Sequence, residues 1–188
     1  MIRVDTELKE RVCQGDIVKD IKHIEHALIR EGNIEISKII FPHVIVLTQD
    51  CDLEQNFLQK RKKSKKPNDD KTLISIIVAP LYNVEHVYDG VHLSELGLQM
   101  RTINRNKEKM ENKYLRYNLM PRYHYLEFPQ GLPLTASVID FKHYFTVGLD
   151  YLENIKSTNF VCKVRELYRE DISQRFANFL SRIGLPNI

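Results

Sequence analysis

Two short apolar runs constrain the fold of this 188-residue chain more than any other feature. Residues 44–48 read VIVLT and residues 72–79 read TLISIIVA, and both runs are rich in β-branched side chains. Short, nearly continuous apolar runs are typical of strands that are buried on both faces. The two runs therefore predict neighbouring strands inside a sheet, with Pro80 ending the second.

Further strands are predicted on both sides of this pair. Residues 15–21 and 34–42 are rich in isoleucine and valine and are bounded by glycine or proline. Residues 122–129 and 134–149 alternate or run apolar in the same manner. Residues 22–33 fit a helical turn and a long hairpin arm equally well. Together these segments predict an antiparallel sheet of about five or six strands.

The last part of the chain predicts an amphipathic helix over residues 165–183, because apolar side chains recur there at three- and four-residue intervals. Gly184 and Pro186 follow as a stop signal. Short strands followed by a packed helix predict an α+β fold, a small antiparallel β-barrel or curled sheet with helical insertions. We expect one domain over residues 1–188, with the barrel core at about 13–150.

Composition narrows the class of protein. An apolar content of 43% and a charged content of 28% are ordinary for a globular protein. No stretch approaches the ~18–20 apolar residues of a membrane helix, and the amino terminus lacks the apolar core of a signal peptide. We therefore expect a cytoplasmic protein without a membrane partner. The three cysteines are scattered and form no C-x-x-C pair, so free thiols are expected.

The stretch QDCD at residues 49–52 is the candidate catalytic site. If it stayed extended, Asp50 and Asp52 would point to one face and could bind Mg²⁺ or serve as general bases. The structural alternative is a helix start in which Asp52 caps backbone amides and Gln55 reaches back. Apart from such a Mg²⁺ ion, the sequence predicts no cofactor and no metal site.

Cys51 lies between the two aspartates and is a third candidate for catalysis. A nucleophilic cysteine needs a nearby base, and the flanking carboxylates disfavour its thiolate. The possible bases are His43, His86, His92 and His124. A zinc site made by Cys13, Cys51 and a histidine lacks the local ligand spacing that such sites show. A small buried side chain is the simpler interpretation of Cys51.

The positive charge of the chain is local. Residues 60–66, KRKKSKK, hold six of the 28 lysines and arginines and no acid, within a segment at about 56–71 that is predicted to be a mobile loop. The candidate nucleic-acid contacts are Lys60, Arg61, Lys62, Lys63, Lys65 and Lys66, together with Arg116 and Arg122. Tyrosines between residues 114 and 125 could stack on bases, or could simply pack against the sheet.

Three stretches carry a resemblance to a known family. GDIV at 15–18, FPHVIVLTQD at 41–50 and LISIIVAPL at 73–81 resemble the core strands of MazF/PemK-like toxins, which have an SH3-like barrel. The likeness covers roughly residues 13–82. Most of the chain, including TQDCDLE at 48–54, VIDF at 138–141 and residues 168–186, is similar to a family of uncharacterised bacterial proteins with an S/T-Q-D-C-D motif.

The resemblance implies a fold without the toxin chemistry. MazF-like ribonucleases carry an arginine just before the second core strand, where this chain has Phe41 and His43. A serine or threonine after the third strand is replaced by Leu81, Tyr82 and Asn83. It therefore implies a binding or regulatory module in a bacterial toxin–antitoxin or phage-defence system, with a protein partner and a possible homodimer.

The alternative is an enzyme. In that case the chain would be a ribonuclease or other phosphodiesterase, an RNA endonuclease that uses Asp50 and Asp52 while the basic residues grip RNA.

Overall fold

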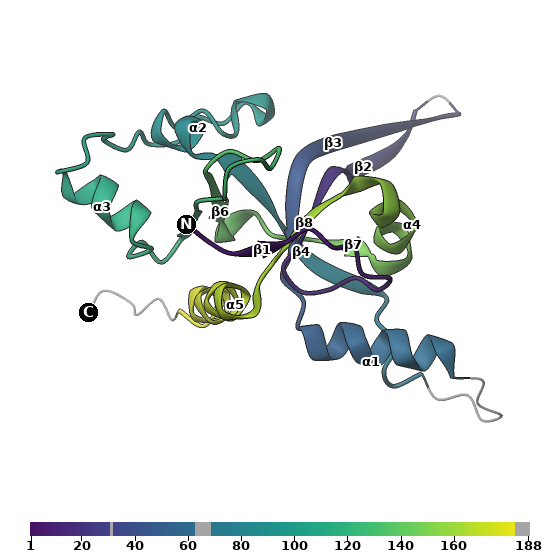
Figure 1. Ribbon diagram of the computed structural model, residues 1–188. Coiled ribbons are helices and arrows are strands. Elements are labelled where there is room, and N and C mark those ends of the chain that lie inside the picture. The colour runs from purple at the N-terminus through teal and green to yellow at the C-terminus, as the bar shows by residue number, and fades with distance from the viewer. Residues whose placement is uncertain (31, 63–68, 183–188) are drawn as a thin grey trace, which may run out of the picture. The chain divides into compact units, whose positions relative to one another are not determined.

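The structure is a computed structural model that describes residues 1–30, 32–62 and 69–182. Within these residues the protein is α+β, and an eight-stranded antiparallel sheet curls into a half-barrel in the order β1-β8-β2-β3-β4-β6-β5, with β7 paired to β4 (Figure 1). The strands are β1 (Val4–Asp5), β2 (Asp16–Arg30), β3 (Asn33–Val46), β4 (Ser75–Asn83), β5 (Tyr123–Leu126), β6 (Ser137–Asp140), β7 (Phe145–Gly148) and β8 (Phe160–Val164).

Helices connect and follow these strands. They are α1 (Asp50–Arg61), α2 (Val84–Tyr88), α3 (Met110–Arg116), α4 (Leu149–Asn159) and α5 (Glu166–Leu180), with 3₁₀ turns η1 (Ser94–Leu96) and η2 (Phe141–His143). The predicted C-terminal helix is confirmed as α5, while residue 183 lies outside the described part of the chain.

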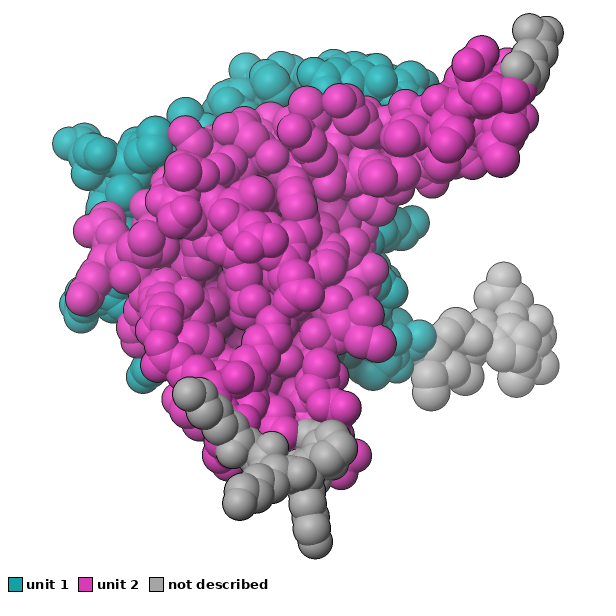
Figure 2. Space-filling model, turned by 90° about the vertical axis from the view of Figure 1, so that its right-hand side faces the viewer, with its two compact units in different colours: residues 1–5, 81–144, 164–188 teal, residues 6–80, 145–163 magenta. Residues whose placement is uncertain are grey.

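The chain gathers into two compact units (Figure 2). Unit 1 comprises residues 1–5, 81–144 and 164–188, and unit 2 comprises residues 6–80 and 145–163. Compactness and independent folding are different properties, so the single domain over residues 1–188 stays a prediction.

Unit 2 is built around the two apolar runs. The end of β3 pairs with β4 through Val44↔Pro80 and Val46↔Val78, and β4 also pairs with β7. The buried side chains of this core are Val12, Val18, Ile21, Val44, Val46, Leu53, Ile76, Val78, Val147, Leu149 and Leu152. The prediction of buried neighbouring strands is therefore confirmed.

Strands β2 and β3 form a long hairpin whose outer half we call the arm, residues 19–30 and 32–43. The register runs from Ile17↔Ile45 to Arg30↔Asn33, with a bulge between Ile24 and His26. The arm projects from the body of unit 2 (Figures 1 and 2). The segment 22–33, which sequence left open, is thus the hairpin arm as far as it is described.

Unit 1 has its own core. The buried residues Val84, Val87, Tyr88, Ile103, Leu115, Tyr125 and Val138 pack together. Helix α5 buries Ile172, Phe176 and Phe179, and the rings of Phe176 and Phe179 lie 5.5 and 5.9 Å from that of Phe141. Part of the predicted apolar stripe of α5 therefore belongs to the core, whereas Leu167 and Leu180 are 79% and 49% exposed.

Three predicted boundaries are wrong. Residues 34–42 and the run that begins at residue 44 were predicted as separate strands, but β3 continues through Pro42. Strand β4 does not end at Pro80, because pairing with β3 through Pro80 gives way to pairing with β6 from Leu81 onward. The predicted loop at 56–71 begins later, because α1 buries Asn56 and continues to Arg61. Asn56 Oδ1 accepts a hydrogen bond of 2.9 Å from the Leu73 amide, a long-range contact that composition does not reveal.

Candidate functional site

The QDCD stretch forms the start of α1, with Gln49 at the N-cap and no side-chain capping bond. Asp50 and Asp52 lie in the first helical turn, where negative charge is favourable. Residues two apart on a helix do not face each other, so the predicted pair of carboxylates on one face is wrong. The predicted cap is wrong as well, because Asp52 lies inside the helix.

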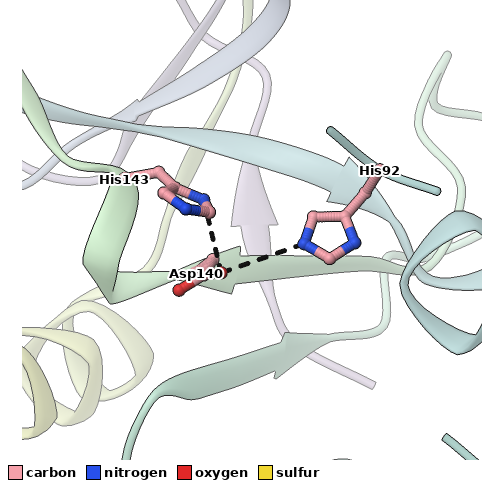
Figure 3. A group of neighbouring side chains, drawn as sticks. All are labelled: His92, Asp140 and His143. Atoms are coloured by element: carbon pink, nitrogen blue, oxygen red, sulfur yellow. Dashed lines mark ion pairs between the residues drawn. The ribbon is translucent and has the colours of Figure 1, made fainter. Parts of the chain in front are cut away.

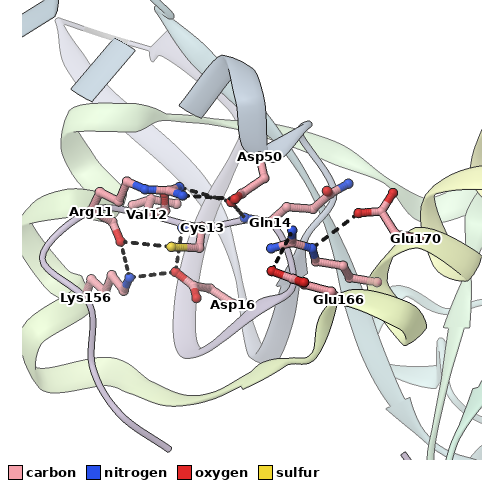
Figure 4. Close-up of polar contacts among 10 residues, drawn as sticks. Arg11, Val12, Cys13, Gln14, Asp16, Asp50, Lys156, Glu166 and Glu170 are labelled. Atoms are coloured by element: carbon pink, nitrogen blue, oxygen red, sulfur yellow. Dashed lines mark hydrogen bonds and ion pairs between the residues drawn. The ribbon is translucent and has the colours of Figure 1, made fainter. Parts of the chain in front are cut away.

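Asp50 connects the first turn of α1 to the segment at residues 11–14, which lies before β2. Its carboxylate accepts bonds of 3.0 and 2.9 Å from the two terminal nitrogens of Arg11, and one of 3.0 Å from the Gln14 amide (Figure 4). The hydrogen bond with Asp50 raises the pKa of Arg11, although burial opposes the shift. These contacts explain Asp50 as a structural residue.

A second network buries opposite charges beside this one. Lys156 Nζ lies 2.7 Å from Asp16 Oδ2, and these side chains are only 3% and 1% exposed (Figure 4). Asp16 also accepts a bond of 2.8 Å from the Cys13 amide, and Lys156 donates to the Arg11 carbonyl. Burial raises the pKa of Asp16, with Lys156 opposing the shift.

The cysteines do not converge on a site. Cys13 and Cys162 are buried and Cys51 is exposed, with its Sγ 3.8 Å from Asp52 Oδ1. Cys51 is therefore not the buried side chain that sequence favoured. No cysteine belongs to a potential metal cluster within the described ranges, so the zinc arrangement considered for Cys13 and Cys51 has no support.

The predicted RNA-binding cations of α1 have acidic partners. Lys60 Nζ lies 2.7 Å from Asp150 and 2.9 Å from Glu153. Arg61 pairs with Glu10. Lys62 ends α1, while Lys63, Lys65 and Lys66 lie outside the described residues. Cations in the last turn of a helix also interact favourably with the helix dipole. The ion pairs and the helix dipole therefore explain the positions of Lys60 and Arg61 without a role in RNA binding.

The two predicted arginines lie in unit 1 and differ in role. Arg122 is bonded to Asp140, at 2.8 Å from Oδ1 and 2.9 Å from Oδ2. Arg116 donates to the Tyr88 hydroxyl at 3.2 Å and helps to line a pocket of about 570 Å³. Lys113 and Tyr117 line the same pocket. RNA binding by Arg116 stays a prediction, whereas Arg122 is committed to an interior carboxylate.

The arm of unit 2 exposes an unusual amount of apolar surface. In the antiparallel register, paired residues share a face and alternate along each strand. One face consequently carries Lys22, Ile24, Ala27, Ile29, Ile34, Ile36, Lys38 and Ile40. We call this set the isoleucine face. Its five isoleucines are between 48% and 80% exposed.

A pocket lies at the base of the isoleucine face. It has a volume of about 460 Å³ and is lined by Lys22, Ile24, Ile36, Lys38 and Tyr151. The Tyr151 hydroxyl, from α4, accepts a bond of 3.1 Å from the Lys22 amide. The face thus combines apolar contact area with two lysines and no acid.

A third cluster, in unit 1, consists of two histidines and an aspartate. Asp140 is the last residue of β6 and His143 the last residue of η2, while His92 lies after α2 (Figure 3). Asp140 Oδ2 lies 3.8 Å from His92 Nε2 and 3.3 Å from His143 Nδ1. In the described ranges, these residues are the one group of three or more that could share a metal ion, with ligand atoms within 4.8 Å of one another.

Two of the three side chains in this cluster are buried. The Asp140 side chain is 0% exposed, and burial alone would raise its pKa, but His92 and Arg122 outweigh burial and lower the pKa to about 2. Burial lowers the pKa of His143, with Asp140 opposing. Burial also raises the pKa of Tyr82, whose hydroxyl lies 3.4 Å from His143 Nδ1.

Sequence reasoning missed this cluster. Only Asp140 and His143 are near each other in the chain, and a D-x-x-H pair is common in proteins without a site. His92 was considered only as a base for Cys51. His143 lies beside Asp140 because η2 follows β6 directly and because Asp140 caps η2 by accepting a bond of 3.0 Å from the Lys142 amide.

Comparisons of the chain with protein-family models, with curated proteins and with solved structures gave no significant match. The likeness to MazF/PemK-like toxins therefore stays a prediction, beyond the antiparallel curled half-barrel that the structure has. None of the described helices combines the length and the apolar character that a membrane crossing requires.

Proposed function

We propose that the protein is a binding module that receives an extended apolar segment of a partner protein on its arm. The observation that carries the proposal is the isoleucine face, with five isoleucines exposed on one side of a projecting hairpin. Full burial of such a side chain contributes about 1.5–3 kcal/mol. Exposed apolar patches of this kind are characteristic of interaction sites.

The edges of the arm support an added strand. Among the described strands, β2 pairs with β8 only at Asp16–Val18, and β3 pairs with β4 only at Val44–Val46. Farther along the arm neither strand pairs with a third described strand, but on β2 the Lys22 amide is bonded to Tyr151 and the Lys19 carbonyl accepts a bond from Asn159. The outer edge of β3 is therefore the edge that a partner strand can join. The bulge near Ile24 interrupts the regular edge of β2, so the edge of β3 is the better acceptor.

The charges beside the isoleucine face indicate which partner segments fit it. Lys22 and Lys38 border the pocket on the isoleucine face, and Glu35 lies on the opposite face. A segment with apolar residues flanked by acids complements this surface, whereas a basic segment is repelled. The bacterial toxin–antitoxin or phage-defence setting is part of the proposal and rests on the resemblance of the sequence alone.

The alternative function, a ribonuclease based on Asp50 and Asp52, lacks a converging pair of carboxylates. Asp50 is bonded to Arg11 and Gln14, while Asp52 is exposed on a different side of α1. The binding module is therefore the function that the geometry supports better.

The test uses a labelled peptide of alternating valine and threonine with glutamates at both ends, measured by fluorescence anisotropy. We expect saturable binding to the wild type and at least tenfold weaker binding to Ile34→Thr/Ile36→Thr, which keeps β-branched side chains on the arm. Ile74→Thr is the control, since Ile74 is 89% exposed outside the arm. A lysine-flanked peptide should bind more weakly than the acidic one.

Two outcomes would overturn the proposal. Equal binding of the acidic peptide to the wild type and the arm variant would exclude the isoleucine face. A dimer in light scattering that the arm variant abolishes would make a second copy of this chain the occupant in place of a different protein.

A further inference from the structure

His92 is the starting point, because its environment lacks what a buried imidazole needs. Its side chain is 1% exposed, and neither ring nitrogen has a hydrogen-bond partner among the described residues. Buried polar groups are nearly always bonded, and an unsatisfied one calls for an explanation. The Tyr82 ring packs edge-on against it at 5.0 Å, so the imidazole is held in place by an apolar contact.

The same imidazole faces one potential ligand, which in turn lies beside a second. Its Nε2 faces Asp140 Oδ2, which also lies 3.3 Å from His143 Nδ1 (Figure 3). We propose that His92, Asp140 and His143 bind one divalent first-row transition-metal ion. The inference is independent of the binding function of the arm, which lies in unit 2.

The donor atoms decide the class of metal. Two of the three are imidazole nitrogens, which suit zinc, cobalt, iron or nickel, whereas magnesium and calcium prefer oxygen ligands. Two histidines and one carboxylate leave at least one coordination position open. The Tyr82 hydroxyl lies 3.4 Å from His143 Nδ1, next to the proposed ligands.

The two distances to Asp140 are close to those around a bound ion, and all three ligand atoms lie within 4.8 Å of one another. With bonds of about 2.0–2.1 Å, ligand atoms around a tetrahedral ion lie about 3.3 Å apart. The His143–Asp140 distance of 3.3 Å already matches, and the His92–Asp140 distance of 3.8 Å exceeds this value slightly. His143 is 25% exposed and provides both the adaptable side chain and the route of entry.

Arg122 would act as an outer-sphere residue that orients the Asp140 carboxylate. Its Nε lies 2.8 and 2.9 Å from the two carboxylate oxygens, and the Lys142 amide donates to Oδ1 at 3.0 Å. Carboxylate ligands are commonly held by such bonds, which fix their orientation. Oδ2, to which the Lys142 amide does not donate, is the oxygen that faces both imidazoles.

The competing explanation is a purely structural ion pair in which a protonated histidine faces Asp140. The two explanations differ in a measurable way, because the ion pair needs no metal. The experiment titrates the full, untagged chain with Zn²⁺ against a chromophoric chelator, and with Co²⁺ while the visible ligand-field bands are recorded. Mg²⁺ serves as the oxygen-preferring probe.

We expect one equivalent of Zn²⁺ or Co²⁺ per chain and no competing uptake of Mg²⁺. His92→Ala and His143→Ala should each bind the metal at least tenfold more weakly. His86→Ala is the matched control, since His86 is an exposed histidine of the same unit. His143→Ala carries the test if His92→Ala fails to fold, because His143 is partly exposed; circular dichroism monitors both variants.

Three results would overturn the inference. The wild type could fail to take up any transition metal, or it could bind the metal as tightly as a folded His143→Ala variant does. Selective uptake of Mg²⁺ would exclude the assigned class of metal.

Discussion

The buried pair of Lys156 and Asp16 offers the sharpest prediction about stability. Replacement of Lys156 by methionine keeps an unbranched apolar stem and removes the charge that lies 2.7 Å from Asp16 Oδ2. Asp16 is 1% exposed and would retain the bond from the Cys13 amide. Removal of one partner from a buried pair costs about 3–5 kcal/mol, because the other charge stays buried without compensation.

The pH dependence follows from the pKa of Asp16. Burial raises this pKa above the value of about 3.9 in an unfolded chain, and Lys156 limits the rise. A raised pKa means that the folded state holds the proton more tightly, so the stability contributed by this group is fully present below pH ~4 and falls as pH rises through the folded value. Without Lys156 the folded pKa rises further. The variant should therefore lose most stability at neutral pH and less near pH ~4.5.

The assay is urea unfolding of the wild type, Lys156→Met, Asp16→Asn and the double variant at both pH values. The double variant removes both charges and should recover most of the stability lost in Lys156→Met at neutral pH. A loss below about 1 kcal/mol in Lys156→Met would refute the reasoning, because that magnitude is typical of an exposed pair. The same cost at both pH values would also refute it.

Two further predictions concern α1 and α5. Asp50→Asn should lower the free energy of unfolding by about 1–3 kcal/mol, because Arg11 loses its charged partner, while the control Asp52→Asn should stay within about 0.5 kcal/mol. RNA cleavage by the wild type that disappears in a normally stable Asp50→Asn variant would instead support catalysis. Phe176→Ala should cost about 3–5 kcal/mol in chemical unfolding. Leu167→Ala, at a position 79% exposed, should have almost no effect, and equal losses would contradict the packing of α5.

The fold could be predicted where local pattern and burial agree. The β-branched run at residues 44–48 and the periodic apolar residues of α5 indicated elements that the structure contains. The secondary structure of residues 22–30 was ambiguous because none of their apolar side chains is buried in a core. Their strand conformation depends on pairing with β3, which a local pattern does not record.

The candidate sites were harder to predict because they depend on distant partners. Asp50 and Asp52 suited either an extended pair or a helix start, and the bonds of Asp50 to Arg11 belong to the helical arrangement. His92 and Asp140 are separated by the whole of α3 and β5, so no spacing rule brings them together.

By itself, the sequence determined the class of fold, the central strands and the C-terminal helix, because hydrophobic periodicity acts over a few residues. Only the tertiary structure decided that QDCD begins a helix, that isoleucines line an exposed arm and that His92 meets Asp140 and His143. Those outcomes depend on register and on long-range contacts, whose free energies are realised only when distant segments have packed together.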